Sequence, residues 1–267
     1  MVEKKTPVGK PADDFIRIQD LWSMFVPKWY WFAISLFITL TIAVLYLLST
    51  PPIYTRTAAI LVQDNSKSSS STSAMNDFSD LGIFKSNTNI NNELLTLKSP
   101  TLMTEVVNRL GLNETFTIRK GLKNVDLYKV SPVTITFCDK IEVPLSFTIK
   151  FSSKEAFAIS ELEISGEDIG ETLSAQMGDS IQTSAGIMIV SPTQEFTDAF
   201  IGTSIRYVRG SVRAAVDTYS NALVAELGNE DATIINLSIN DTSIRKAEDI
   251  LNTLIEVYNE NWIRDKN

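Results

Sequence analysis

Few residues in this sequence could do chemistry. The 267-residue chain has no histidine and a single cysteine, Cys138. Without histidine it can build no Ser-His-Asp or Cys-His nucleophile and no imidazole metal site, and one cysteine allows neither an intrachain disulfide nor a multi-cysteine zinc site. Cys138 ends an alternating segment, and we interpret it as a small packing residue.

Adjacent carboxylates and one arginine cluster are the remaining candidates. The acidic pairs are Asp13-Asp14, Glu167-Asp168, Glu230-Asp231 and Glu248-Asp249. Such pairs usually mark turns or solvated helix faces, and no GxxxxGK[ST] or GxGxxG phosphate cradle accompanies them. Arg206, Arg209 and Arg213 fit either a solvated strand-to-helix junction or a contact with an anionic glycan or a neighbouring subunit. We therefore expect no catalytic residue, no cofactor and no metal, and the net charge of −8 argues against a nucleic-acid partner.

One apolar segment is long enough to cross a membrane. Residues 29–50 contain no charge, glycine or proline, and at about 1.5 Å per residue they would extend about 33 Å, enough to cross a bilayer core. The alternatives are a buried soluble helix and a cleaved signal peptide; the long uncharged run and the mixed-charge residues before it favour a transmembrane helix. Its expected anchoring side chains are Lys28, Trp29, Trp31 and Tyr46.

Basic residues predict the orientation of this helix. Lys4, Lys5, Lys10, Arg17 and Lys28 precede it. Only Arg56 and Lys67 follow within about twenty residues, so the positive-inside rule places residues 1–28 in the cytoplasm and the remainder across the membrane, in a bacterium the periplasm. Residues 13–25 are expected to form an interfacial helix on the cytoplasmic leaflet of the membrane, with a short strand plus an ordinary helix start as the alternative.

The remainder, residues 51–267, predicts a mixed α/β domain. Residues 53–62 are typical of a strand, and the Ser/Asn-rich residues 64–89 of a flexible loop. Two short helices then meet at Ser99-Pro100, where Ser99 is a suitable N-cap and Gly111 a suitable C-cap for the second helix.

The spacing of apolar residues along the chain changes after about residue 115 and again after residue 208. From about residue 115 to 208 it is two, which predicts a largely antiparallel β region. A helical stripe from Val212 to Leu227 closed by Gly228, a strand at residues 235–239, and a second helical stripe from Ile244 to Tyr258 follow. The predicted fold class is α+β: an N-terminal transmembrane helix, then an extracytoplasmic domain whose helices cover one face of a largely antiparallel sheet.

Four ordered stretches resemble the Wzz family of chain-length determinants, the polysaccharide co-polymerases of bacterial surface glycans. They are Asp20-Leu21-Trp22 with Lys28-Trp29; Pro52-x-Tyr54-x-x-x-Ala58-x-Ile60-Leu61-Val62; Glu93-Leu94-x-x-Leu97-Lys98-Ser99; and Ala247-x-x-Ile250-Leu251-Asn252-x-Leu254-x-x-x-Tyr258. The residues to which the resemblance gives structural roles are Pro52, Tyr54, Glu93, Leu94, Ser99, Ala247, Asn252 and Tyr258. The β region adds little to the likeness.

The resemblance implies a scaffold and not an enzyme. Family members form closed rings beside a polymerase that acts on lipid-linked glycan, and regulate the length or export of an O-antigen, capsule or exopolysaccharide. The implied partners are other copies of the chain, the polymerase and the lipid-linked glycan, with an outer-membrane export protein as a further candidate. The implied location is the inner membrane, with the main domain in the periplasm.

The end of the chain departs from the family pattern. Family members return to the membrane through a second helix, and some continue into a cytoplasmic tyrosine autokinase. Since this sequence stops at Asn267 before either, we expect it to be the N-terminal part of a longer protein, in which any kinase activity would belong to the missing part. The competing interpretations are the extracytoplasmic sensor domain of a receptor, a periplasmic adaptor of an export machine and a tethered enzyme.

Overall fold

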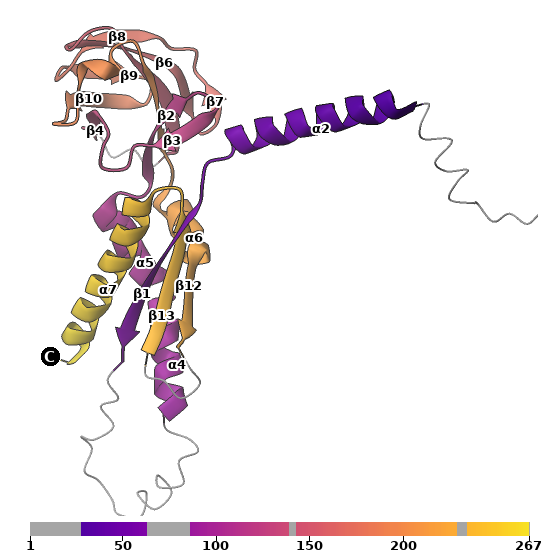
Figure 1. Ribbon diagram of the computed structural model, residues 1–267. Helices are drawn as coiled ribbons and strands as arrows, with labels where there is room; N and C mark the ends of the chain where they lie inside the picture. The colour runs from indigo at the N-terminus through magenta and orange to yellow at the C-terminus, as the bar shows by residue number, and fades with distance from the viewer. Residues whose placement is uncertain (1–27, 63–85, 139–142, 229–233, 267) are drawn as a thin grey trace, which may run out of the picture. The chain divides into compact units, whose positions relative to one another are not determined.

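The computed structural model describes residues 28–62, 86–138, 143–228 and 234–266, which belong to two compact units, residues 1–50 and 51–267 (Figure 1). The predicted interfacial helix at residues 13–25 lies outside the described residues, as do residues 64–85 of the predicted loop. The last four residues of that predicted loop are helical, because helix α4 already begins at Ser86.

The first unit contributes helix α2, Trp29–Ser49. Its polar side chains do not interrupt it, because the hydroxyls of Thr39 and Thr41 each donate a 2.8 Å hydrogen bond to the carbonyl four residues earlier. Pro51 and Pro52 follow directly, and the residue before a proline is driven out of the helical region, which ends the helix. The predicted span of residues 29–50 is thus confirmed as a helix to within one residue.

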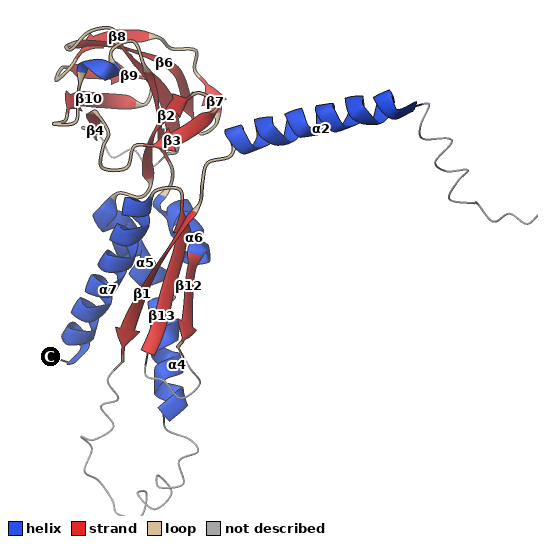
Figure 2. Ribbon diagram, viewed as in Figure 1, coloured by secondary structure: helices blue, strands red, loops and turns tan. Residues whose placement is uncertain are grey.

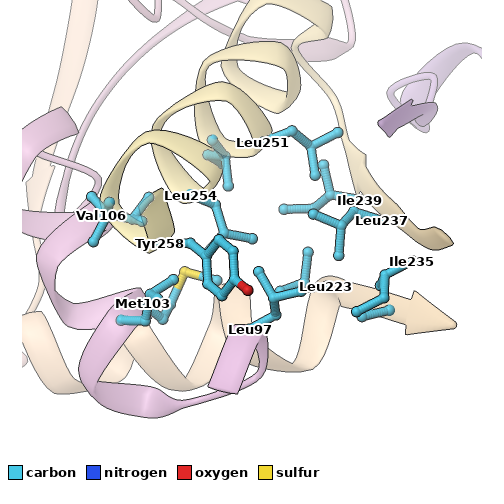
Figure 3. Close-up of a cluster of buried hydrophobic side chains, with 14 of the residues drawn as sticks. Leu97, Met103, Val106, Leu223, Ile235, Leu237, Ile239, Leu251, Leu254 and Tyr258 are labelled. Atoms are coloured by element: carbon cyan, nitrogen blue, oxygen red, sulfur yellow. The ribbon is translucent and has the colours of Figure 1, made fainter. Parts of the chain in front are cut away.

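The second unit contains an α/β layer. Strands β1 (Tyr54–Leu61), β13 (Ile234–Asp241) and β12 (Leu223–Leu227) form an antiparallel sheet in the order β1-β13-β12. Helices α4 (Ser86–Leu97), α5 (Pro100–Leu110), α6 (Val212–Ala222) and α7 (Ile244–Lys266) pack against one face of it. Figure 3 shows this core, in which Leu251, Leu254 and Tyr258 of α7 lie near side chains of the sheet and of α4 and α5.

The alternation of residues in strand β13 explains why helices cover one face of the sheet and leave the other open. Alternate residues of β13, from Ile235 to Ile239, are buried, whereas Ile234, Asn236 and Asn240, which lie on the other face of the strand, are exposed. This period of two places one row of side chains on the helices and the other on the opposite surface.

The long β region forms a separate lobe with its own core (Figure 2). Its strands are β2 (Glu114–Lys120), β3 (Lys123–Asp126), β4 (Val133–Phe137), β5 (Leu145–Phe151), β6 (Ala156–Ile164), β7 (Glu167–Asp168), β8 (Leu173–Gln176), β9 (Ser180–Thr183), β10 (Gly186–Pro192) and β11 (Ser204–Arg209), with a 3-10 turn at Asp198–Phe200. Seven strands form one antiparallel sheet, β3-β2-β11-β5-β6-β7 with β8 also beside β6, and β4-β10-β9 form another. The α+β class is confirmed, but the strands belong to three sheets and the helices cover only the three-stranded sheet of the α/β layer.

One predicted helix was too long. The stripe from Val212 to Leu227 was expected to be helical throughout, yet α6 ends at Ala222 and Leu223–Leu227 form β12. Leu223 and Leu227 are four residues apart, which suits a helix face, but an even spacing also suits one face of a strand. Pairing with β13 decides the matter, because it buries Leu223 and Ala225 against the helices.

Candidate functional site

The membrane helix carries the predicted anchoring residues on its surface. Trp29, Trp31 and Tyr46 are 68%, 64% and 71% exposed, and none of the 21 residues of α2 is buried within the protein. Lys28 is exposed directly before the helix. The helix is long and apolar enough to cross a membrane, so α2 suggests a membrane anchor.

Two residues of separate Wzz-like stretches meet in the α/β layer. The hydroxyl of Tyr258 on α7 donates a 2.7 Å hydrogen bond to Oε2 of Glu93 on α4. Burial, together with this carboxylate, raises the pKa of Tyr258 above its ordinary value, so the hydroxyl keeps its proton. Leu94 and the fully buried Ala247 belong to the same core.

The other residues of those stretches have local roles. Ser99 caps α5, where its Oγ accepts a 3.3 Å hydrogen bond from the amide of Thr101. Pro52 and Tyr54 lie in the connection to β1 and at its first residue. Asn252 is exposed on α7 in a small cleft that also contains the 3.1 Å ion pair between Arg56 and Glu248.

A buried ion cluster joins the β lobe to the α/β layer. Lys246, in the first turn of α7, is only 7% exposed. Its ammonium forms an ion pair with Asp126 at the end of β3 and lies 3.5 Å from Asp241 at the end of β13. Burial alone would lower the pKa of Lys246, but Tyr219 and the two carboxylates outweigh it and hold the pKa above its ordinary value. Lys246 is therefore charged and fixed between the two parts.

A second ion pair lies one helical turn further along α7. The ammonium of Lys129, three residues after Asp126, lies 2.7 Å from Asp249, three residues after Lys246. The positive charge is on the helix in the first pair and on the β lobe in the second. The two pairs therefore attach the segment after β3 to α7 in one register, because a shift would bring like charges together.

A cleft of about 320 Å³ opens beside these pairs. Lys246, Tyr219 and Tyr128 line it together with carboxylates and hydroxyls from the β lobe. This cluster was not predicted from the sequence, since Asp126 and Lys246 are 120 residues apart. One signal was available, because Lys246 lies four residues before the buried Ile250 and hence on the apolar face of its helix.

The three arginines of the predicted cluster do not share a surface. Arg206 and Arg209 are three residues apart on strand β11 and so point to opposite faces of the sheet. Nη2 of Arg206 lies 3.0 Å from Oε2 of Glu163 and 3.1 Å from Oγ of Ser146.

The other two arginines differ in their surroundings. The guanidinium of Arg209 lies over the ring of Phe137, 4.9 Å from its centroid, and 3.7 Å from Glu114. Arg213 is exposed on α6, where no ion pair with another described residue engages it. The contact predicted for these three residues stays a prediction.

The described residues form no candidate metal site. Among residues 28–62, 86–138, 143–228 and 234–266, no three His, Cys, Asp or Glu side chains are grouped so that they could hold a metal ion. Cys138 is exposed, so it is not the packing residue that the sequence predicted. The strand period explains the difference, because Cys138 lies two residues after the exposed Thr136 and hence on the same face.

Comparison with known proteins gives a family match in the N-terminal part of the chain. Residues 14–110 match the family model of Wzz, chain length determinant protein. The predicted resemblance to the Wzz family is thereby confirmed; three of its four stretches lie within this range, and the stretch at residues 247–258 lies outside it. No curated protein matches the chain. The Wzz match supports a role in determining the chain length of a polysaccharide, and together with α2 it suggests a membrane-anchored protein.

Proposed function

We propose that this Wzz-domain protein is a polysaccharide co-polymerase of the bacterial inner membrane, which acts as a ring-forming scaffold without catalysing a reaction. It regulates the length or export of a surface polysaccharide such as an O-antigen, a capsule or an exopolysaccharide. The observation that carries the proposal is the Wzz match over residues 14–110, which includes both the exposed apolar helix α2 and the strand β1 that follows it.

A scaffold that controls length by its shape must be rigid. In this protein the β lobe is held to α7 by the ion pairs of Lys246 and Lys129, and α7 is held to α4 by the hydrogen bond between Tyr258 and Glu93. These contacts support a domain that moves as one body. Buried, mutually satisfied ion pairs also fix one arrangement, because any other leaves a charge without its partner.

The ring requires a heterologous contact, in which two different surfaces of each copy meet and the rotation closes. Bulk charge does not provide it, because residues 54–267 contain 19 Lys and Arg against 28 Asp and Glu and copies repel at long range. The contact between copies must therefore come from specific surfaces of the domain. The exposed Arg213 is a candidate for a contact with a carboxylate of the next copy or with an acidic glycan.

The proposed orientation places residues 1–28 in the cytoplasm and the domain after α2 in the periplasm, where the glycan grows. The proposed partners there are the polysaccharide polymerase and its lipid-linked glycan, and an export protein of the outer membrane is a third. The basic residues before α2 support this orientation.

Mass photometry of the detergent-extracted protein tests the ring. We expect one narrow species whose mass, after subtraction of the micelle, is a fixed multiple of the chain mass at all protein concentrations from nanomolar upward. Negative-stain images of the same sample should show closed rings. A species with the mass of one chain under every mild detergent would contradict the proposal.

A further inference from the structure

Strand β1 is a long edge of the three-stranded sheet. All eight residues of β1 pair with β13 in one uninterrupted register, from Tyr54 opposite Asp241 to Leu61 opposite Ile234. No other strand of the described residues pairs with β1. No residue of β1 is buried, and Leu61 is 65% exposed. Its outer row of backbone N–H and C=O groups is thus available to another strand.

The two outermost strands of the seven-stranded sheet in the β lobe are short and charged. In the β lobe, β7 consists only of Glu167 and Asp168, and β3 has four residues that include Lys123 and Asp126. Proteins use such devices, together with prolines and bulges, to stop edges from pairing with other chains. β1 has none of them. Its one charged side chain, Arg56, forms an ion pair with Glu248 of α7 and so does not guard the edge.

The opposite edge of the same sheet is also free. β12 pairs only with β13 among the described strands. Both β1 and β12 are antiparallel to β13, so they run parallel to one another. The register aligns Thr57 with Ser238 and Val224 in one row, and Ala59 with Asn236 and Glu226 in the row two residues further along. The two edge strands of each copy therefore run in the same direction, so β12 of one copy can pair in parallel with β1 of another.

Two parallel edge strands suit the rotational symmetry of a ring. A copy rotated about an axis along the strands brings its β12 beside the β1 of its neighbour without being inverted, and the contact repeats around the ring. Pairing of β1 with β1 about a two-fold axis would instead be antiparallel, with the two strand starts about 25 Å apart. That pairing is complete with two copies and builds no ring.

We propose that β1 of each copy pairs in parallel with β12 of the next copy, so that the three-stranded sheets join into one continuous sheet around the ring. The partner is a second copy of this chain, and the pairing rests on the proposed ring. On the open face, the exposed side chains of Thr55, Thr57, Asn236 and Asn240 then continue from copy to copy as a band of hydroxyl and amide groups.

Cysteine cross-linking in isolated membranes tests this interface. In a Cys138→Ser background, Val224→Cys is combined in turn with Thr55→Cys, Thr57→Cys and Ala59→Cys, which covers the registers around the aligned row. Within one chain β13 separates the two cysteines, so their Cα atoms are about 9.5 Å apart, too far for a disulfide that needs at most about 7 Å. Any disulfide therefore joins two copies. The matched control combines Val224→Cys with Ser180→Cys, which lies on the edge strand β9 of the β lobe.

The inference predicts a ladder of covalent multimers on non-reducing gels for at least one β1 position, which reducing agent collapses. The control should give no covalent multimers. Mass photometry of the same samples separates the two proposals. Rings without a ladder at any of the three positions would overturn the β1–β12 pairing and leave the proposed ring intact, whereas single chains without a ladder would overturn both. Dimers from Val224→Cys alone would indicate a two-fold contact of β12 and would also overturn the pairing.

Discussion

The hydroxyl of Tyr258 donates a 2.7 Å hydrogen bond to the carboxylate of Glu93, although 165 residues separate them. Glu93 lies within the range that matches Wzz, and Tyr258 lies far beyond it. The bond joins α7 to α4, so the last described helix completes the core of the layer that begins with the Wzz match. The β lobe is therefore inserted into this layer, and the segments before and after it share one hydrophobic core.

Removing this hydroxyl should weaken the domain measurably. Tyr258→Phe keeps the ring in the core but deprives the Glu93 carboxylate of its donor, which costs about 1–3 kcal/mol for a hydrogen bond to a charged group. We expect the thermal midpoint, followed by circular dichroism in detergent, to fall by about 3–8 °C. Tyr54→Phe is the control, because Tyr54 is 40% exposed and should shift the midpoint by less than about 1 °C. Equal midpoints for the two variants would contradict the role given to this bond.

The two ion pairs at the lobe junction should differ greatly in their contribution to stability. Lys246→Met leaves the carboxylates of Asp126 and Asp241 without their buried partner, and loss of one member of such a cluster costs about 3–5 kcal/mol. Lys129→Met removes a half-exposed ammonium, and an exposed pair is worth about 0–1 kcal/mol. Urea unfolding followed by tryptophan fluorescence should show a much lower midpoint for Lys246→Met than for Lys129→Met. Similar midpoints would show that the Lys246 cluster is solvated.

The pKa of Lys246 predicts how this contribution depends on pH. The folded state raises the pKa of Lys246, so the folded protein holds this proton more tightly than the unfolded chain does. The stabilisation is complete below the ordinary lysine pKa of about 10.4 and is lost as the pH rises above it towards the folded value. The difference in unfolding free energy between the wild type and Lys246→Met should therefore be constant from about pH 7 to 9.5 and shrink at higher pH. A difference that shrinks below pH 9 would contradict the raised pKa.

The single cysteine provides a test of orientation. Cys138 is exposed and lies in the domain that we place in the periplasm. A membrane-impermeant maleimide should label it in spheroplasts without detergent. The control is Cys138→Ser combined with Thr6→Cys, which should be labelled only after the membrane is dissolved. The reverse pattern would show that the N-terminus is outside.

Local signals in the sequence predicted individual elements well. Ser99, Pro100 and Gly111 delimit α5 as expected, and Gly111 adopts the left-handed conformation at φ 62° that a C-cap glycine allows. The alternating residues 145–151 form β5 over the predicted range. Such signals depend on neighbours within a few residues, so the sequence alone contains them.

Contacts between distant residues were not predictable in the same way. Alternation identifies strands but not their partners, so the sequence did not show that β12 pairs with β13 or that the strands form three sheets. It also suggested one cluster from Arg206 and Arg209, whereas the strand period places them on opposite faces. The buried cluster of Lys246 with Asp126 and Asp241 depends on how the β lobe meets α7, and no local pattern encodes that meeting.

The most direct measurement is the length distribution of the surface polysaccharide in the bacterium that carries this gene. The polysaccharide is extracted from the wild type, from a deletion strain and from the deletion strain complemented with the intact gene, and each is separated by gel electrophoresis. The account predicts a preferred length in the wild type, its loss in the deletion strain and its return on complementation. An unchanged length distribution and amount of polysaccharide in the deletion strain would contradict it.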